Sequence, residues 1–351
     1  MATQPQPATR PFPAQLTDLA PGVILSASVA VVAYLAAPYV GRYVPIPAMV
    51  LALVIGIALN PIAGGALVRP GMAFCVRTVL RWAVALLGLR VALSDIEALG
   101  LSTGVMIVIA MMVTLLSGFL FARLSGRSAG FGALVGAATA VCGASATLAT
   151  STVVPEYPGK AADIAFVVVA VNALATLAMI VYPPLCILLG FDAQATGVML
   201  GGTIHDVAQV VGAGYAVSDT AGNTAVIVKL FRVFLLLPVV LGIGWYFTKR
   251  GVEHGAARVP VPGFALVFLA LCFINSAMLL APQASFAFVP VKHGLVEAST
   301  WGLLIAIGAL GLDTSVSAIV SLGWRHVATV VASTAVMFAL VTGFLLAQKF
   351  I

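Results

Sequence analysis

Charged residues are scarce in this sequence: Asp, Glu, Lys and Arg together make up only 8% of its 351 residues. Soluble globular domains contain about 25% of these residues. Hydrophobic residues reach 62% and the mean hydropathy is +1.15, so the composition excludes a soluble globular protein. A membrane β-barrel would show short alternating segments, whereas this chain has uninterrupted apolar runs of about 20 residues. We therefore predict an all-α integral membrane protein.

Cysteine is also rare, and its distribution argues against metal and disulfide chemistry. The four cysteines lie in apolar runs without Cys-x-x-Cys spacing. We expect no metal and no other cofactor. Basic residues outnumber acidic ones, 17 to 11, but they are scattered between the apolar runs, which gives no case for a nucleic-acid partner. No phosphate-binding loop or protease motif supports an ATP-driven pump or an intramembrane protease.

Eleven apolar runs are long enough to predict transmembrane helices. They cover residues 22–38, 46–60, 73–94, 101–122, 131–154, 162–189, 194–217, 223–247, 262–281, 297–319 and 326–348. We predict about eleven transmembrane helices in one polytopic transporter domain, residues 22–348. A flexible cytoplasmic tail, residues 1–21, precedes it and is rich in proline.

The distribution of basic residues predicts the orientation in the membrane, since loops rich in Lys and Arg stay in the cytoplasm. An odd number of spans places the two termini on opposite sides. The side with the N-terminus contains Arg10, Arg69, Arg77, Arg123, Arg127, Lys249, Arg250, Arg258 and Arg325, and the other side contains only Arg42, Lys160, Lys292 and Lys349. We expect a cytoplasmic N-terminus and a periplasmic C-terminus.

Polar groups are most concentrated in the seventh run, in the stretch Gly201-Gly-Thr-Ile-His-Asp-Val-Ala-Gln-Val-Val-Gly-Ala-Gly214. His205 and Gln209 are four residues apart, which places them on the same helix face, and Asp206 is three residues from Gln209. Ionisable groups inside a span are costly and usually face a cavity or a partner. We interpret this stretch as a substrate or coupling site. Interhelical hydrogen bonding alone is the alternative interpretation.

The fifth run contains many small and hydroxyl-bearing residues, with Gly143 at its centre. The segment reads Gly136-Ala-Ala-Thr-Ala-Val-Cys-Gly-Ala-Ser-Ala-Thr-Leu-Ala-Thr-Ser-Thr152. This composition is typical of a discontinuous helix, whose freed amides and positive half-helix N-terminus favour an anion. Close packing of small residues between helices is the alternative. A nucleophilic Cys142 has no flanking signature to support it.

Several basic residues fall inside the predicted spans. Arg81 and Arg232 lie deep in the third and eighth spans, and we expect both to face the bundle interior, because a cation facing lipid there costs roughly 3 kcal/mol. Lys229 shares a face with Arg232 but lies, like Arg77 and Arg90, nearer a span end, and we expect these three to snorkel to the headgroups. Asp206 and Asp313 are candidate counter-charges.

Three stretches carry a resemblance to a bacterial family. Val141-Cys-Gly-Ala-Ser-Ala146, Thr203-Ile-His-Asp-Val-Ala-Gln-Val-Val-Gly-Ala-Gly214 and Ala225-Val-Ile-Val-Lys-Leu-Phe-Arg232 resemble inner-membrane proteins of the YeiH/TauZ type, which are described as candidate sulfate exporters. The resemblance implies a bacterial inner-membrane location and an architecture similar to the cation/proton antiporter and anion transporter superfamily, with inverted repeats and broken helices. In such a fold the second crossover can also lie at Gly311 and Asp313 of the tenth span.

Together these observations lead to the hypothesis of a secondary transporter for a small anion such as sulfate or sulfite. The expected partners are this anion and the lipid bilayer, and a homodimer is a further candidate assembly. A passive anion channel and a membrane-embedded enzyme or sensor component are the alternatives. His205 and Asp206 would carry coupled protons. The predicted substrate-binding residues are Thr139, Cys142, Gly143, Ala144, Ser145, Thr203, Gln209, Arg232 and Arg81.

Overall fold

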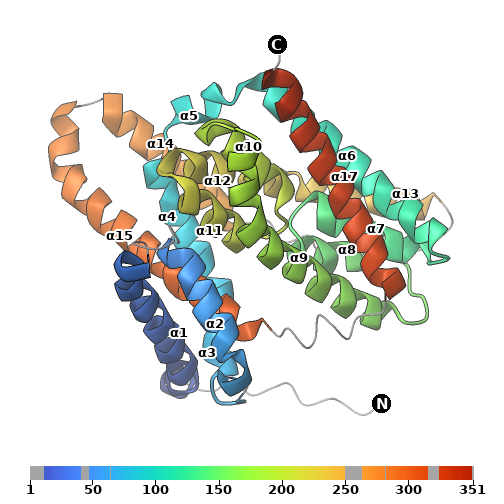
Figure 1. The fold of residues 1–351 in the computed structure, drawn as a ribbon, viewed down its shortest axis with the longest axis horizontal. Helices are drawn as coiled ribbons and strands as arrows, with labels where there is room; N and C mark the ends of the chain where they lie inside the picture. The colour runs from blue at the N-terminus through green and yellow to red at the C-terminus, as the bar shows by residue number, and fades with distance from the viewer. Residues whose placement is uncertain are drawn as a thin grey trace. The chain divides into compact units, whose positions relative to one another are not determined.

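The computed structural model describes residues 12–40, 47–63, 65–249, 263–280, 282–314 and 324–349. All regular structure in these ranges is helical (Figure 1), as predicted. The helices are α1 (Phe12–Val40), α2 (Ala48–Ala63), α3 (Arg69–Phe74), η1 (Cys75–Val79), α4 (Leu80–Leu86), η2 (Leu87–Arg90), α5 (Leu93–Ala98), α6 (Gly100–Leu124), α7 (Ala129–Ala140), α8 (Ala144–Ser151), α9 (Lys160–Leu188), α10 (Ala193–Thr203), α11 (Val207–Val217), α12 (Asp219–Phe234), α13 (Leu236–Thr248), α14 (Gly263–Leu280), α15 (Pro282–Asp313) and α17 (Trp324–Lys349).

Seven of the predicted spans correspond to helical segments that are long and apolar enough to cross a membrane. They are Asp18–Val40, Arg69–Arg90, Gly100–Leu124, Lys160–Leu188, Asp219–Thr248, Phe288–Asp313 and His326–Lys349. The other four predicted spans fall on α2, on α14 and on the pairs α7–α8 and α10–α11, and of these helices α2, α7, α11 and α14 are short and apolar. The count of eleven is therefore not confirmed, because α2 and α14 are short and the fifth and seventh runs each contain a break. Of the predicted tail, residues 1–11 lie outside the described ranges, and 12–21 belong to α1.

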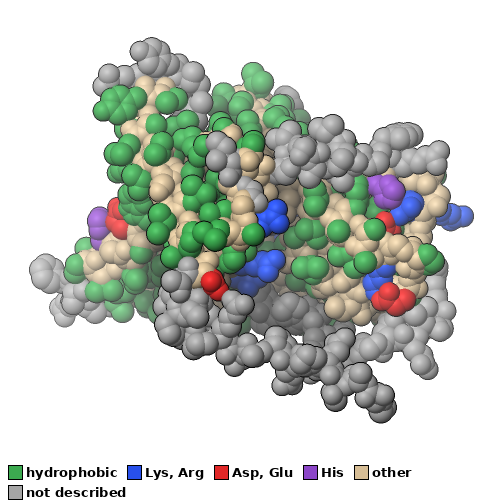
Figure 2. Space-filling model, turned by 90° about the horizontal axis from the view of Figure 1, so that it is seen from below, with side chains coloured by type: hydrophobic (Ala, Val, Ile, Leu, Met, Phe, Trp, Pro, Cys, Tyr) green, Lys and Arg blue, Asp and Glu red, His purple; other side chains and the backbone are tan. Residues whose placement is uncertain are grey.

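Large hydrophobic side chains cover much of the described surface. On the face shown in Figure 2 they dominate, and charged side chains occur in a few small groups. Leu101, Leu124 and Leu188 are among the most exposed, at 85%, 73% and 83%. Soluble monomers rarely expose contiguous apolar surface on this scale, whereas lipid tails solvate it. This surface and the seven long spans support a multi-pass membrane protein.

The chain forms two compact units. The first consists of the described residues up to Arg81 and the end of α15 from Leu304. Its helices approach one another at glycines. A Cβ on Gly22 of α1 would lie 2.1 Å from the carbonyl oxygen of Val68, and one on Gly56 of α2 would lie 2.6 Å from that of Gly308. No larger residue fits at these contacts, so glycine is what permits the packing.

The second unit, which contains the remaining described residues from Trp82 onward, has its core where α6, α7, α9 and α17 meet. Phe131, Leu134 and Val167 are fully buried there. α17 lies alongside α6 (Figure 1), and α12 packs against both α10 and α11. Glycine again controls the distance: a Cβ on Gly201 of α10 would lie only 2.4 Å from the carbonyl oxygen of Ala225 in α12. This close approach positions the site.

Candidate functional site

The helix of the fifth run is interrupted, as its sequence predicts. α7 ends at Ala140, and Val141 adopts φ −114° and ψ −86°, outside the helical region. Gly143 has φ +59° and ψ −120° before α8 begins at Ala144. Residues with a side chain rarely adopt this conformation, so the break depends on glycine at position 143.

A second interruption lies in the seventh run. α10 ends at Thr203, Ile204 is extended, and α11 begins at Val207. Asp206 caps α11: its carboxylate accepts the backbone N–H of Ala208 at 2.8 Å. The two breaks adjoin each other, since a Cβ on Gly143 would lie 3.6 Å from the carbonyl oxygen of His205. We call this meeting point of residues 141–143 and 204–206 the crossover.

Two buried cations from α12 bind the carbonyl ends of the two interrupted helices. The ammonium of Lys229 donates to the carbonyl oxygens of Val141, Ile204 and His205, at 2.8, 3.0 and 2.5 Å. An ammonium has three hydrogens, and these three bonds would use all of them. Lys229 can reach these carbonyls because Gly201 lets α12 lie close to α10. The last carbonyls of a helix lack intrahelical partners and carry partial negative charge, so cations stabilise them.

Arg232 binds the same two helix ends with all five of its N–H groups. Nε donates to Ala140 O, Nη1 donates to Gly201 O and Ile204 O, and Nη2 donates to Thr139 O and Ala140 O, all between 2.9 and 3.2 Å. The side chain is fully buried. No N–H remains for a ligand, and no ion pair of Arg232 with Asp206 or Asp313 forms among the described residues.

The structure corrects two expectations about charge. Lys229 does not snorkel, because its side chain is fully buried in the crossover. The spacing of three residues between Lys229 and Arg232 was the signal for this pair. Arg81 does not point into a bundle interior: it is exposed on α4. Arg232 alone of the two deep arginines takes the predicted interior position.

Some of the other predicted anion ligands already form hydrogen bonds within the protein, and others lie at the exposed start of α8. The hydroxyls of Thr139 and Thr203 donate to carbonyls of their own helices, Val135 O at 2.9 Å and Met199 O at 2.6 Å. The thiol of Cys142 is buried. Ala144 is half-buried and Ser145 is exposed, and both lie in the first turn of α8, where backbone amides have no intrahelical acceptor. The start of α8 therefore offers backbone amides that have no intrahelical acceptor, next to an exposed hydroxyl.

His205 is held in one orientation and has one unoccupied nitrogen. Its Nε2 lies 2.8 Å from Thr334 Oγ1, and that hydroxyl donates its own hydrogen to Val330 O at 2.9 Å. Thr334 must therefore accept from His205 Nε2–H, which leaves Nδ1 as the acceptor. Nδ1 is buried and has no partner in the described part of the chain, and the same is true of Gln209 Oε1.

The charges of the crossover do not balance. The two C-terminal helix ends carry about −0.5 elementary charge each and the two N-terminal ends about +0.5 each, so they cancel. With all three groups in their charged forms, Lys229 and Arg232 contribute two positive charges and the capping carboxylate of Asp206 contributes one negative charge. The crossover is left with a net charge of about +1. A bound anion would compensate it.

The alternative second crossover at Gly311 and Asp313 lies in the first unit. α15 is continuous through Gly311 and ends at Asp313, whose side chain is exposed. Asn60 of α2 donates to Leu312 O at 2.7 Å and so caps this helix end. The residues that follow, 315–323, lie outside the described part of the chain. Within that part, the interruptions that meet are those at 141–143 and 204–206.

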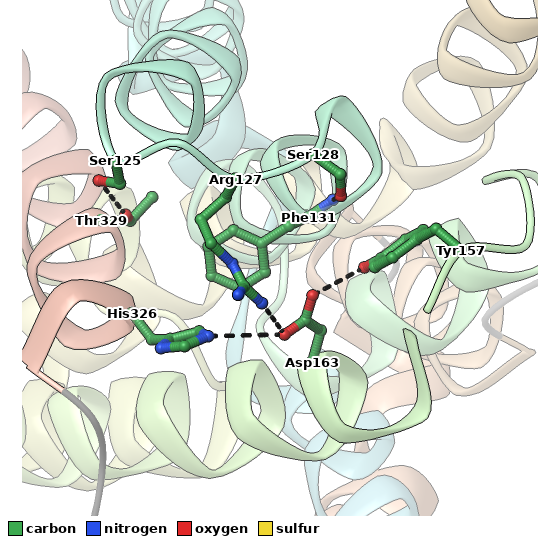
Figure 3. A network of polar contacts seen from close by, with 8 residues as sticks. All are labelled: Ser125, Arg127, Ser128, Phe131, Tyr157, Asp163, His326 and Thr329. Atoms are coloured by element: carbon green, nitrogen blue, oxygen red, sulfur yellow. Dashed lines mark hydrogen bonds and ion pairs between the residues drawn. The ribbon is translucent and has the colours of Figure 1, made fainter. Parts of the chain in front are cut away.

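A second polar cluster, which the sequence did not indicate, surrounds Asp163 near the starts of α7, α9 and α17 (Figure 3). Its buried carboxylate binds Arg127 Nη2 at 2.6 Å and the hydroxyl of Tyr157 at 3.1 Å, and His326 Nε2 lies 3.7 Å away. Burial and the adjacent Asp163 charge raise the pKa of Tyr157. Ser128 caps α7 beside the cluster. The cluster ties three helix ends together. No His, Cys, Asp and Glu side chains group as metal ligands in the described ranges.

Comparison with known proteins identifies the family. A family model described as "Conserved hypothetical protein 698" matches residues 21–330. The UPF0324 membrane protein TauZ of Paracoccus pantotrophus is 42% identical over 326 residues, which cover 92% of this chain and 93% of that protein. The UPF0324 inner membrane protein YeiH of Escherichia coli K12 is 34% identical over 258 residues, 72% of this chain and 71% of that protein. No solved structure matches. The chain belongs to the UPF0324 family of membrane proteins.

Proposed function

We propose that the protein is a secondary transporter that exports a small oxyanion of the sulfate or sulfite class across the bacterial inner membrane, coupled to protons. One observation carries this proposal: two interrupted helices meet inside a membrane protein, and two fully buried cations bind their carbonyl ends. Breaking two helices in a membrane exposes backbone groups at considerable cost, and such breaks occur where the backbone lines a substrate site.

The anion would bind at the N-terminal end of α8, where the backbone amides of Ala144 and Ser145 have no intrahelical acceptor and the Ser145 side chain is exposed. Lys229 and Arg232 would act through their charge and by holding the helix ends in place, since their N–H groups are already bonded. This changes the role expected for Arg232 from direct contact to electrostatic support. Helix N-termini bind oxyanions with backbone N–H groups in this way.

Charge balance supports proton coupling. A monovalent anion would neutralise the crossover, whose net charge is about +1, but a divalent anion such as sulfate would leave a net charge of about −1. One proton taken up with the anion restores neutrality. The atoms that could accept it are His205 Nδ1, which is unpartnered, and the carboxylate of Asp206. The other ionisable groups around them are Lys229, Arg232 and Cys142.

The proposal includes a topology. If α2, α14 and the pairs α7–α8 and α10–α11 also cross, the seven long spans become eleven, with the N-terminus cytoplasmic and the C-terminus periplasmic. Both interrupted pairs have the same order: a half-helix of 12 or 11 residues, a break of about three residues, and a half-helix of 8 or 11 residues. Inverted repeats, which are common in secondary transporters, remain part of the proposal, but these two pairs would cross in the same direction and so would not be each other's inverted counterparts. A homodimer remains part of the proposal.

The test is flux into proteoliposomes that contain the purified protein. Sulfate, sulfite, chloride and an organic sulfonate would be compared with and without an imposed pH gradient. We expect saturable flux of one oxyanion that the gradient accelerates, and His205→Gln should keep binding but lose the response to the gradient. Flux that never saturates would indicate a channel, and flux of none of the four would refute the proposal. Arg123→Gln, which removes an exposed cation from α6, is the matched control.

A further inference from the structure

A cavity of about 480 Å³ lies in the second unit, between the end of η2, the first turn of α12 and one face of α15. Arg90, Asp219, Asn223, Val289, Lys292, His293 and Val296 line it. The α15 residues follow the spacing i, i+3, i+4 and i+7, so one stripe of that helix forms a wall. One water occupies about 30 Å³ in the liquid. The cavity can therefore hold an oxyanion with part of its hydration shell.

The amide that faces this cavity is oriented by a hydrogen bond. The hydroxyl of Tyr215 donates to Asn223 Oδ1 at 2.6 Å, so the oxygen of the amide is occupied. The hydrogens of Nδ2 then have no partner in the part of the chain that the structure describes. Lys292 is positioned similarly, because Nζ donates one hydrogen to Asn275 Oδ1 at 2.7 Å and Asn275 Nδ2 donates to Val91 O. Two hydrogens of the Lys292 ammonium remain for a ligand.

The lining is rich in donors and positively charged. Arg90 and Lys292 give two positive charges against one carboxylate, that of Asp219, and His293 adds a further ring nitrogen. The ion pair between Arg90 and Asp219 is long, at 3.3 Å, and the Asp219 side chain is 81% exposed, so solvent screens it. The guanidinium of Arg90 lies over the Tyr215 ring, 5.3 Å from its centroid, which holds it at the rim of the cavity.

We propose that this cavity is an oxyanion-binding site, distinct from the crossover. Its ligand is a sulfate, sulfonate or phosphate group, because Arg and Lys donors with one amide match the oxygens of such a group. The group can belong to a free anion or to an anionic lipid headgroup. Asp219 and Asn223 lie at the start of α12, and Lys229 is ten residues after Asp219 on the same helix, about 15 Å along its axis. The site does not depend on the transport proposal.

Equilibrium dialysis of the full-length protein in detergent, with radiolabelled sulfate and inorganic phosphate as probes, tests a free anion. The double variant Arg90→Gln with Lys292→Gln should bind about tenfold or more weakly, as expected for lost charge-assisted hydrogen bonds. Lys349→Gln removes an exposed cation from the end of α17 and should bind as the native protein does. Ser145→Asp targets the crossover and should remove the sulfate bound there, but it should leave the sulfate that the double variant removes, and this difference separates the two proposals.

Native mass spectrometry of protein extracted from nanodiscs containing phosphatidylglycerol tests a lipid headgroup. If the double variant loses bound phosphatidylglycerol while its sulfate and phosphate binding stay at the native level, the ligand is the headgroup. If it alters neither sulfate binding, phosphate binding nor lipid retention, the proposal is overturned. Arg90→Lys with Lys292→Arg preserves the charge and should restore binding, and a native thermal midpoint for each variant ensures that the comparison concerns folded protein.

Discussion

Replacing Ser145 by Asp should block anion binding at the crossover without unfolding the protein. Ser145 is the second residue of α8 and its side chain is exposed, so a slightly larger side chain fits. A carboxylate in the first turn of a helix is itself favourable, by roughly 0.3–1 kcal/mol. The added charge would occupy the positive helix end that the substrate is proposed to use. Ser145→Asn has nearly the same shape without the charge.

The size of the effect follows from Coulomb's law. If the carboxylate lies about 6 Å from the bound anion, an effective dielectric constant of about 20 gives a repulsion of about 3 kcal/mol for a singly charged anion. That energy weakens binding about a hundredfold at 25 °C. A divalent anion would be repelled about twice as strongly. Ser145→Asn should change affinity by no more than about threefold, since surface substitutions usually stay within about 0.5 kcal/mol.

The assay is initial uptake of radiolabelled sulfate into proteoliposomes over a range of concentrations, with the thermal midpoint of each variant measured in parallel. We expect the KM of Ser145→Asp to rise about a hundredfold and its thermal midpoint to stay the same or increase. Ser102→Asp is the matched control, because Ser102 is also exposed in the first turn of a helix, α6. Equal uptake by the Asp and Asn variants would refute an anion at the α8 N-terminus.

Four further predictions concern the crossover and the Asp163 cluster. Gly143→Ala should destabilise the protein by about 1–3 kcal/mol, visible as a lower thermal midpoint, because alanine is strained at φ +59° and ψ −120°. Lys229→Met should cost about 3 kcal/mol or more, since it leaves the carbonyls of Val141 and His205 without a donor while Ile204 O keeps only its bond from Arg232, whereas Lys229→Arg should recover part of the folded yield in size-exclusion chromatography. The raised pKa of Tyr157 means that its contribution to stability is complete below about pH 10 and is lost as the pH rises further, which a pH series of thermal midpoints with Tyr157→Phe as reference would detect. Asp163→Asn should lower the midpoint at neutral pH by weakening the bond to Arg127.

Some features of this protein follow from local sequence alone. Membrane insertion follows from apolar runs, because each residue contributes its own transfer free energy regardless of its distant neighbours. The interruption at Gly143 is also local, because it depends on a backbone conformation that favours glycine. Asp206 at the second break is a helix cap, and that pattern too is set within three residues. The sequence pattern therefore identifies both interruptions and the residues next to them.

The direction in which buried side chains point was decided by tertiary structure. Lys229 and Arg81 both lie in apolar segments, and their positions in the sequence suggested a snorkelling lysine and an inward arginine, the reverse of what is found. Lys229 is buried because Gly201 lets α12 approach α10 closely enough for the ammonium to reach carbonyls of residues 25 and 88 positions away. Hydrogen bonds between segments so distant in the chain depend on how the helices pack, so no local sequence pattern predicts them. The role of the cations as caps of two helix ends emerges only when those ends meet.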